Sequence, residues 1–378
     1  MKQRPPVHIV KSILWLAVLF SIPLPAALKA EPYLAVRTGL KCSACHVNMS
    51  GGGKRTQFGV IYSQTYLPLF TRILNSKKSF FSSALNDQIS IGGNLRVINK
   101  TTFGEGRREP TEHKRDNTFD ITEGNVYFEM EVVRNLVSVY VDETLAPSGA
   151  SNREAALIIK NLPFNSYLKA GRILLPYGYR LLNDDSFIRQ KTGFNYDNQD
   201  LGGEIGLEPG PFSLIMALSN GTLGSTDSNL DKQFSTVGSY ITRHFRIGGS
   251  FARNRASDVL RYTYGGFIGL YAGRFTVLAE ADVIDERIEN QTNPPDQFAF
   301  FSELDFLLLQ GLNLKFAYDF YDPFKNIAED ERDVITIGVE CFVTPFLQFR
   351  TLYRRLDSIA QKPREKEDQF FIELHTYL

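Results

Sequence analysis

From Asp87 to the C-terminus, the chain repeats short segments in which apolar and polar side chains alternate. Examples are "NVYFEMEV" (125–132) and "ITIGVECFV" (335–343). A period of two is typical of β-strands whose two faces meet different environments. Most segments are close to the ~9–11 residues that a tilted membrane strand requires. We predict about sixteen strands, at 87–98, 122–133, 136–144, 154–161, 166–173, 200–208, 211–219, 234–244, 246–254, 260–271, 273–284, 297–309, 311–321, 333–344, 346–355 and 368–378.

The connections between these segments differ in length in a regular way. After even-numbered segments they are tight, as at "PG" (209–210) and "QG" (310–311), and after odd-numbered segments most are longer and more polar. The connection at 255–259 is the exception. Short turns at one rim and long loops at the other are typical of bacterial outer-membrane barrels, whose strand number is even and whose short turns are periplasmic. On this pattern both chain termini lie in the periplasm.

Together these features predict an all-β fold, a transmembrane antiparallel β-barrel of about sixteen strands that occupies residues 87–378. The alternative is a soluble sandwich or propeller, which also has many short strands but does not usually sustain such an alternation of loop lengths. The chain ends in Tyr377-Leu378 rather than in the terminal aromatic residue common in these barrels. The expected location is the lipid of the bacterial outer membrane.

Two of the chain's three cysteines stand close together ahead of the strands, in "CSACH" (42–46). C-x-x-C-H is the attachment sequence of c-type haem, in which Cys42 and Cys45 bond the macrocycle and His46 is the proximal iron ligand. A zinc half-site would need a second ligand pair, and a thioredoxin-like disulfide would need a βαβ setting. The sequence shows neither, so we expect one covalently bound c-type haem.

The part of the chain before the strands divides in two. Residues 1–30 combine a basic start, the apolar run "ILWLAVLFSIPL" and "ALKA" before Glu31, which predicts a secretory signal peptide rather than a membrane anchor. Residues 31–86 form the haem-binding segment, mainly α, with short helices broken at Pro68. The first 30 residues hold four basic and no acidic residues, so 38 basic residues face 42 acidic ones in the rest. This balance excludes a typical nucleic-acid-binding protein.

The second axial ligand of such a haem is less constrained. Met49 is close in sequence, but three residues of chain span at most ~10 Å, which barely reaches the opposite face of a haem. His244, at the end of the eighth segment, and His375, near the C-terminus, both fall on the polar, lumen-facing side at the periplasmic rim. We prefer His375, with His244 and Met49 as the other candidates and an open sixth position as the alternative.

The run "SGGGKR" (50–55) follows the haem motif directly. Its three glycines allow positive φ and a close approach of the backbone to a flat ligand. Lys54 and Arg55 then offer cations for the haem propionates. The alternative is a flexible turn with a solvated basic pair.

The residues "AVRTGLKCSACH" (35–46) and "FG" (58–59), ahead of a predicted barrel, resemble the fused monohaem c-type cytochrome–porins. The best-known members are outer-membrane iron oxidases of iron-oxidising bacteria. The resemblance implies electron transfer between an external or lumen-bound donor or acceptor, with Fe(II) among the candidates, and a periplasmic c-type cytochrome or other redox carrier. The run 50–59 departs from the iron-oxidase pattern, which leaves the donor open.

The barrel also resembles the sixteen-stranded porins, in which the third external loop folds into the lumen, and "GRILLPYGYRL" (171–181) looks like a segment of anion-type porins. The third long connection, 174–199, is the longest one in this chain. Opposed charges on a constriction select solutes by charge and size. An ordinary solvated surface loop is the alternative. The loop residues of interest are Tyr177, Tyr179, Arg180, Asp184, Asp185, Arg189 and Lys191.

Two functions of different classes follow. The first is an electron-transfer protein, a candidate oxidoreductase, in which lumen-facing Glu129, Glu131, Asp142 and Glu340 either attract a metal cation or only keep the lumen hydrated. One haem cannot bridge about 30 Å of hydrocarbon, so a substrate enters the lumen or a partner completes the path. The second is a solute-selective porin with a haem-bearing plug or docking segment, and a sheath around a separate multihaem cytochrome is a third. Analogy with porins makes a homotrimer a candidate assembly.

Overall fold

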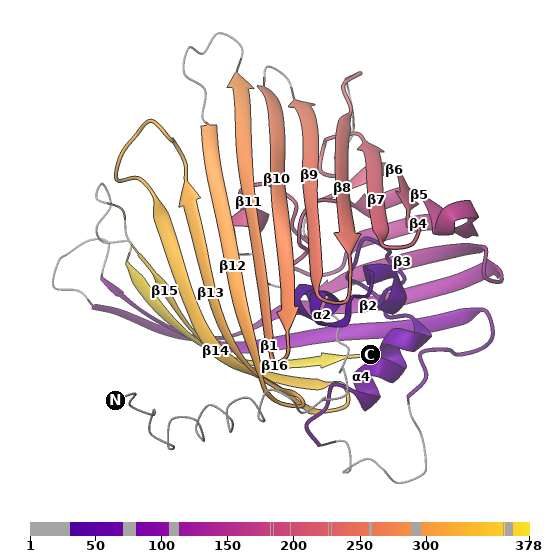
Figure 1. Cartoon of the computed structure of the whole chain (residues 1–378), viewed down its shortest axis with the longest axis horizontal. Coiled ribbons are helices and arrows are strands. Elements are labelled where there is room, and N and C mark those ends of the chain that lie inside the picture. Colours follow the sequence, from indigo (N-terminus) through magenta and orange to yellow (C-terminus); the bar gives the residue numbers. More distant parts are fainter. Residues whose placement is uncertain are drawn as a thin grey trace, which may run out of the picture.

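The strands of the chain close into a single antiparallel barrel. The structure, a computed structural model, describes residues 31–70, 81–105, 113–181, 183, 185–196, 198–225, 227, 229–256, 259–288, 296–357, 359 and 366–378. Sixteen strands lie within these ranges, and each pairs with its neighbours in sequence (Figure 1). β1 pairs with β16 to close the sheet. The predicted all-β barrel of about sixteen strands is therefore confirmed. The predicted signal peptide, residues 1–30, lies outside the described residues.

The strand boundaries are close to those expected from the alternation of side chains. The strands are β1 (Ile89–Glu105), β2 (His113–Val133), β3 (Val137–Ala146), β4 (Ser151–Leu162), β5 (Ser166–Leu174), β6 (Gln199–Leu207), β7 (Phe212–Ser219), β8 (Gln233–Ile241), β9 (Phe245–Ala256), β10 (Val259–Ala272), β11 (Phe275–Ile288), β12 (Asp296–Leu309), β13 (Leu312–Asp322), β14 (Arg332–Thr344), β15 (Leu347–Leu356) and β16 (Glu367–Tyr377).

The first hairpin differs from the prediction. Residues 99–121 were expected as a long loop, but β1 continues to Glu105 and β2 begins at His113, so most of this stretch is paired strand. The extension is mostly polar, and Phe103 and Phe119 are too isolated to form the continuous apolar face that marks a membrane strand in the sequence. Its pairing rests on the backbone ladder and on side-chain amides, since the amides of Asn99 and Asn117 bond each other at 3.1 Å.

The two faces of the barrel wall have the expected character. On β2, Val126 and Val132 are 47% and 52% exposed and point outward, whereas Tyr127 and Glu129 are 2% and 6% exposed and point into the lumen. The same division holds along the other strands, where aliphatic and aromatic side chains form the outer surface and charged and polar ones the inner surface. An outer apolar band around a polar interior is the pattern of transmembrane barrels.

Loops of different length lie at the two rims. The tight turns are at 134–136, 163–165, 208–211, 242–244, 273–274, 310–311 and 345–346, at the same rim as the C-terminus. Such short connections need left-handed backbone positions, which Asn135 (φ 58°) and Gly311 (φ 77°) supply. We call this the short-turn rim. The longer connections lie at the opposite rim, as predicted.

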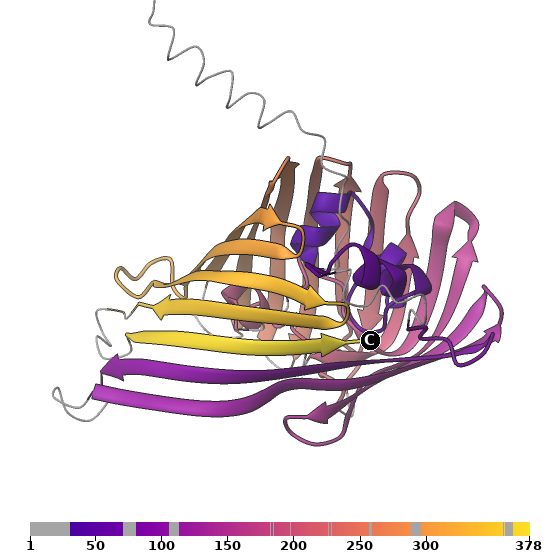
Figure 2. The same ribbon diagram turned by 90° about the horizontal axis from the view of Figure 1, so that it is seen from below.

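The described N-terminal residues, 31–70, enter the barrel and form what we call the plug. They contain three short helices, α2 (Pro32–Thr38), α3 (Cys42–Cys45) and α4 (Gln57–Thr65). Figure 2 shows them enclosed by the strands near the short-turn rim. Among the described residues, no helix has the length and apolar character needed to cross a membrane.

The first part of the plug is held by charged and polar groups of the wall. Glu31 lies 3.5 Å from Lys315 on β13 and 3.9 Å from Arg350 on β15. Arg37 donates from Nε to Thr276 on β11 at 3.1 Å and from Nη1 to Asn313 on β13 at 3.0 Å. Buried charges need such partners, because an unpaired charge away from water is costly. Polar and charged groups of the wall therefore compensate the buried charges of the plug.

The long connection between β5 and β6, residues 175–198, folds into the lumen, and we call it loop L3. It contains the short helix α5 (Phe187–Gln190). Its contacts reach across to β11, since Tyr177 donates to Asp282 at 2.8 Å and Arg189 pairs with Glu280 at 2.5 Å. The predicted inward fold of this loop is confirmed. Asp184, which was named with the loop charges, lies outside the described residues.

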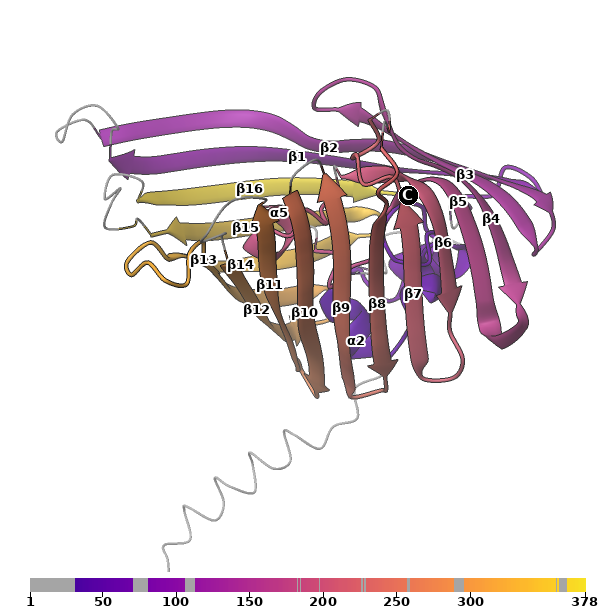
Figure 3. The ribbon, with the colours of Figure 1, turned by 90° about the horizontal axis from the view of Figure 1, so that it is seen from above.

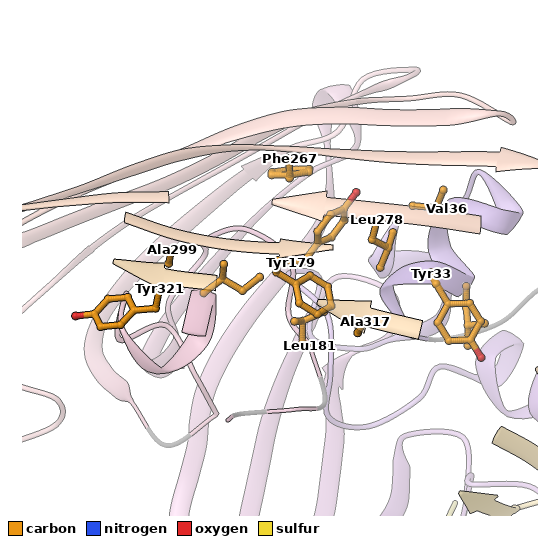
Figure 4. Close-up of a cluster of buried hydrophobic side chains, with 12 residues drawn as sticks. Tyr33, Val36, Tyr179, Leu181, Phe267, Leu278, Ala299, Ala317 and Tyr321 are labelled. Atoms are coloured by element: carbon orange, nitrogen blue, oxygen red, sulfur yellow. The ribbon is translucent and has the colours of Figure 1, made fainter. Parts of the chain in front are cut away.

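Side chains of loop L3, of α2 and of the barrel wall meet in one apolar cluster inside the lumen (Figure 4). α2 packs against β10 and β11 near the short-turn end of the barrel (Figures 1 and 3). The cluster joins the plug, the loop and the wall, so that the interior is a packed core at this level. Its labelled members are Tyr33, Val36, Tyr179, Leu181, Phe267, Leu278, Ala299, Ala317 and Tyr321.

The pair between Arg189 and Glu280 predicts a large stability effect. Both side chains are 1% exposed, so Arg189→Met would leave Glu280 as an uncompensated buried charge. We expect a loss of about 3–5 kcal/mol in the free energy of unfolding. The measurement is the unfolding of the barrel by urea in detergent, with gel mobility used to distinguish the folded from the unfolded chain. Arg255→Met is the matched control, because Arg255 is half exposed and 3.9 Å from Asp231. Equal losses in both variants would contradict the prediction.

Candidate functional site

The haem motif forms a compact unit within the plug. After α3, the chain turns back on itself, since Val47 N donates to Lys54 O at 2.9 Å and His46 pairs with Arg55 as an isolated bridge. Thr56 then caps α4, because its Oγ1 accepts from Gly59 N at 3.1 Å and donates to Ala44 O at 2.9 Å. Cys42–His46 is thus fixed between α4 and the 46–55 hairpin.

This unit is tied to the strands on the other side of the barrel from α2. Asn48 is fully buried and its amide nitrogen donates to Glu154 on β4 at 2.6 Å. Lys169 on β5 donates to the amide oxygen of Asn48 at 3.2 Å and pairs with Glu154 at 2.6 Å. Lys41 donates to the backbone oxygen of Glu208 at 2.6 Å. With the contacts of α2, these bonds fix the plug around most of the inner circumference.

A large cavity lies next to the haem motif, and we call it the plug cavity. Its empty volume is about 1440 Å³, including a part open to solvent. The cavity brings together the predicted residues Cys42, Cys45, His46, Met49 and His375.

The two cysteines of the motif do not form a disulfide. Cys45 is 6% exposed, and burial, with Cys42 nearby, raises the pKa of its thiol to about 11. At neutral pH this thiol is protonated, whereas thiol exchange and zinc binding need a thiolate. Among the described residues there is no group of three or more His, Cys, Asp or Glu side chains placed to hold a metal ion.

Arginine side chains of the plug, the loop and the wall converge on the cavity. Arg55, Arg180 and Arg246 each have a buried guanidinium nitrogen without a hydrogen-bond partner, namely Arg55 Nε, Arg180 Nη1 and Arg246 Nε. Within the described part of the chain, none of the three has a carboxylate at ion-pair distance. Unsatisfied buried donors carry a free-energy cost, so this arrangement favours an anionic group in the cavity.

The basic pair that follows the glycines divides between two roles. Lys54 is 2% exposed and pairs with Glu129 on β2 at 3.2 Å, so it faces the wall. The expectation that both Lys54 and Arg55 would offer cations to haem propionates therefore holds geometrically for Arg55 alone, which lines the cavity. The guanidinium of Arg55 also lies 4.4 Å from the ring of Tyr377 on β16.

His375 faces the cavity from β16 and is 5% exposed. Gln348 lies directly opposite it on β15, and Arg96 lies opposite it on β1. The centroid of its ring is 5.2 Å from that of Tyr377, and Tyr377 in turn contacts Arg55 of the 46–55 hairpin. The last strand thus brings a histidine to the cavity that already contains the C-x-x-C-H motif.

The other two candidate axial ligands are placed differently. Met49 is half-buried and lines the cavity, on the same hairpin as His46. His244 is exposed in the 242–244 turn and does not line the cavity. The sequence placed it in a lumen-facing strand, but β8 ends at Ile241, and the alternation of side chains stops there. Cys341 lies on β14 and does not line the cavity either.

The lumen-facing acids named from the sequence have partners. Glu129 pairs with Lys54 and Lys160, and Glu131 pairs with Lys160 at 2.7 Å. Asp142 pairs with Arg153 at 2.9 Å. Glu340 accepts from Tyr33 of the plug and from Gln348. Glu129 and Glu340 thus join the plug to the wall, whereas Glu131 and Asp142 pair with basic residues of β4, so the structure gives no support to a shared cation site.

A second cavity lies toward the long-loop rim, and we call it the vestibule. Its empty volume is about 2450 Å³, including a part open to solvent. Residues of loop L3 and the β3–β4 connection line it, and Arg354 pairs there with Asp185 of the loop at 3.0 Å. The vestibule and the plug cavity are both lined by Glu31, Pro32, Glu123, Arg153 and Tyr196.

Several residues of the site could not be identified from the sequence. Gln348, Asn94 and Arg246 line the plug cavity but belong to strands without any motif. Their inward parity was readable from the alternation of side chains. Their meeting around one cavity depends on strand register and on the depth of the plug, which the sequence does not give.

No protein-family model matches the chain, and no curated protein is similar enough in sequence to match it. Solved structures of outer-membrane proteins share its fold. OmpT of Vibrio cholerae, in its trimer form, has a TM-score of 0.61 at 14% identity, covering 77% of this chain and 99% of OmpT. The anion-selective porin of Comamonas acidovorans gives 0.60 at 9% identity, covering 77% and 99%. Salmonella typhi OmpF in complex with daunomycin gives 0.56 at 11%, covering 79% and 100%. The chain has the fold of outer-membrane porins.

The glycine hairpin predicts a specific weakness of the plug. Gly53 has φ +65°, and an added Cβ would lie 2.2 Å from the hydroxyl oxygen of Tyr140. In Gly53→Ala, the clash with Tyr140 should therefore make the folding of the plug into the barrel less favourable by about 1–3 kcal/mol, in addition to the cost of backbone strain. Gly210→Ala is the matched control, because Gly210 has φ +52° and open space around the added Cβ. The measurement is the rate at which a protease cuts the plug of the folded barrel. Equal rates in the two variants would contradict the prediction.

Proposed function

We propose that the chain is a porin-type protein of the bacterial outer membrane whose plug carries one covalent c-type haem. The shared fold with outer-membrane porins and the outer apolar face support the membrane part. The placement of Cys42, Cys45 and His46 beside a large, arginine-rich cavity supports the haem part, and this single observation carries it. On this proposal the short-turn rim, with the C-terminus, faces the periplasm.

The residues around the plug cavity fit a haem. Cys42 and Cys45 would form the two thioether bonds, and His46 would bind the iron from the proximal side. The unsatisfied guanidinium nitrogens of Arg55, Arg180 and Arg246 would pair with the propionates. When bound, a haem supplies a centre that accepts and releases one electron. The buried aromatic lining of Tyr179 and Phe267 would limit water access.

The activity that this arrangement favours is electron transfer at the periplasmic end of the barrel. A soluble redox carrier, such as a periplasmic c-type cytochrome, would approach the short-turn rim. A donor or acceptor such as Fe(II) would enter the vestibule, because one haem cannot bridge about 30 Å of hydrocarbon. In this scheme the acids Glu129, Asp142 and Glu340 would have a structural role, since each has a partner among plug or wall residues.

Solute passage is the second candidate activity, and the porin fold with its inward loop L3 favours it. Asp185 of loop L3 and Arg354 of β15 pair at 3.0 Å and both line the vestibule. Opposed charges at a constriction select solutes by charge. In this case the haem-bearing plug would act as a partial stopper or a docking element. A homotrimer is the candidate assembly, because OmpT of Vibrio cholerae is described in a trimer form.

Electron transfer predicts a strict dependence on the motif cysteines. Outer-membrane fractions should contain the chain with haem that survives denaturation, and Cys42→Ala with Cys45→Ala should remove it. In liposomes that enclose a soluble cytochrome, external Fe(II) should reduce the cytochrome at least ten times faster with the native chain than with the double variant. Cys341→Ala is the control and should keep both haem and rate, because Cys341 lies away from the cavity. A native chain without covalent haem would overturn the proposal.

Solute passage predicts conductance that survives loss of the cysteines and depends on the loop charges. Asp185→Asn would leave Arg354 without its 3.0 Å partner, so the reversal potential in planar bilayers should shift toward anion selectivity. Asp87→Asn is the control, because Asp87 pairs with Arg134 on the short-turn side, outside the vestibule. If no variant conducts, or if both asparagine variants shift equally, the channel candidate is wrong.

A further inference from the structure

We infer that His375 binds the haem iron through Nε2, as the second axial ligand opposite His46, and that Gln348 sets its tautomer. This inference rests on the proposed function, because it assumes a haem attached at Cys42 and Cys45. It goes further in assigning the last strand of the barrel a direct bond to the cofactor carried by the plug. The hydrogen bonds around His375 support this assignment.

The orientation of the Gln348 amide is fixed by two carboxylates. Its Nε2 donates to Glu340 Oε1 at 3.0 Å and to Glu31 Oε1 at 3.3 Å. Carboxylates only accept hydrogen bonds when ionised, so both contacts require the nitrogen of the amide on that side. The amide oxygen of Gln348 must therefore face His375, and it contacts Nδ1 of the ring.

This contact determines which ring nitrogen carries the proton. A neutral histidine has one donor and one acceptor nitrogen. Because Nδ1 of His375 faces an oxygen, Nδ1 carries the hydrogen and donates to Gln348. The lone pair is then on Nε2. A histidine that binds a metal usually donates its other ring N–H to a carbonyl or carboxylate in the same way.

Among the described residues, the lone pair on Nε2 has no hydrogen-bond donor to accept from. Nε2 faces the amide oxygen of Asn94, while the amide nitrogen of Asn94 is used in a hydrogen bond to Glu123. Two lone pairs therefore oppose each other unless a cation lies between them. A metal ion at Nε2 would resolve the conflict, with a small movement of Asn94.

The position of His375 suits this role. His46 and His375 line the same cavity, and the contacts from His46 through Arg55 and Tyr377 to His375 are continuous. His244 lies outside the cavity, and Met49 shares the hairpin of His46. A bond from His375 to iron would join the N-terminal plug to β16, and thereby link the two ends of the described chain through the cofactor.

The experiment compares the native chain with His375→Ala, purified from membranes in detergent. The native ferric protein should be six-coordinate and low-spin, with the near-infrared magnetic circular dichroism of two imidazole ligands. His375→Ala should lose at least nine-tenths of the low-spin signal, and added imidazole should restore it. His375→Met should raise the reduction potential, as methionine ligation does. The matched control, His244→Ala, should leave spectrum and potential unchanged, because His244 lies in an exposed turn.

The outcomes separate this inference from the proposed function. Covalent haem in all variants, with a native spectrum that is high-spin or shows thioether ligation, would overturn the role of His375 and leave the haem proposal standing. An unchanged low-spin spectrum in His375→Ala would do the same. A native chain without haem would remove both. If His375→Ala does not give a folded barrel, the native spectrum alone decides, since the number and kind of axial ligands are read from it directly.

Discussion

The pairing of β1 with β16 is the constraint on which the rest of the structure depends. Strands in lipid must satisfy every backbone group within the sheet, so the barrel has to close on itself. The register of this closure sets Asn94 opposite Tyr377 and Arg96 opposite His375. The plug then has its polar partners at fixed positions around the lumen. A shift of this pairing by one residue would turn His375 to the outer face and would remove the cavity's far wall.

The charged contacts inside the lumen determine where the plug lies more than how stable the barrel is. Lys315 on β13 illustrates this point, because it lies within 4.0 Å of carboxylates on Glu31, Glu303, Asp305 and Glu340. Desolvation of such groups offsets most of their attraction, so their net stabilisation is small. Removing one partner is costly, however, and the observed placement of the plug gives Glu31 and Lys54 their partners on the wall. The ion pairs thus specify the depth at which the haem motif lies.

Much of this architecture was predictable, for identifiable physical reasons. A membrane barrel needs different faces on each strand, so the number of strands and most boundaries follow from alternation alone. The extension of β1 and β2 was missed, because polar residues such as Asn99 and Asn117 interrupt the apolar face there. The C-x-x-C-H motif was recognised from spacing and the inward orientation of His375 was predicted from parity, and the structure places both at the plug cavity. His244 was misplaced because β8 ends at Ile241 and the alternation does not continue through the turn, and Gln348 and Asn94 were not identified because their contacts arise only across the β15–β16–β1 register.

The two cavities offer a physical answer to how one haem could serve a membrane barrel. Arg153 and Tyr196 are among the side chains that line both cavities. On the proposed function, a solute in the vestibule would stand behind these side chains, and a carrier at the short-turn rim would meet the other side of the cavity. Because the plug lies inside the lumen, the distance over which electrons would have to pass would be shorter, and no second haem would be needed to cover it. On the same proposal, because the Cys45 side chain is 6% exposed in the folded barrel, attachment of the haem would have to precede entry of the plug into the lumen.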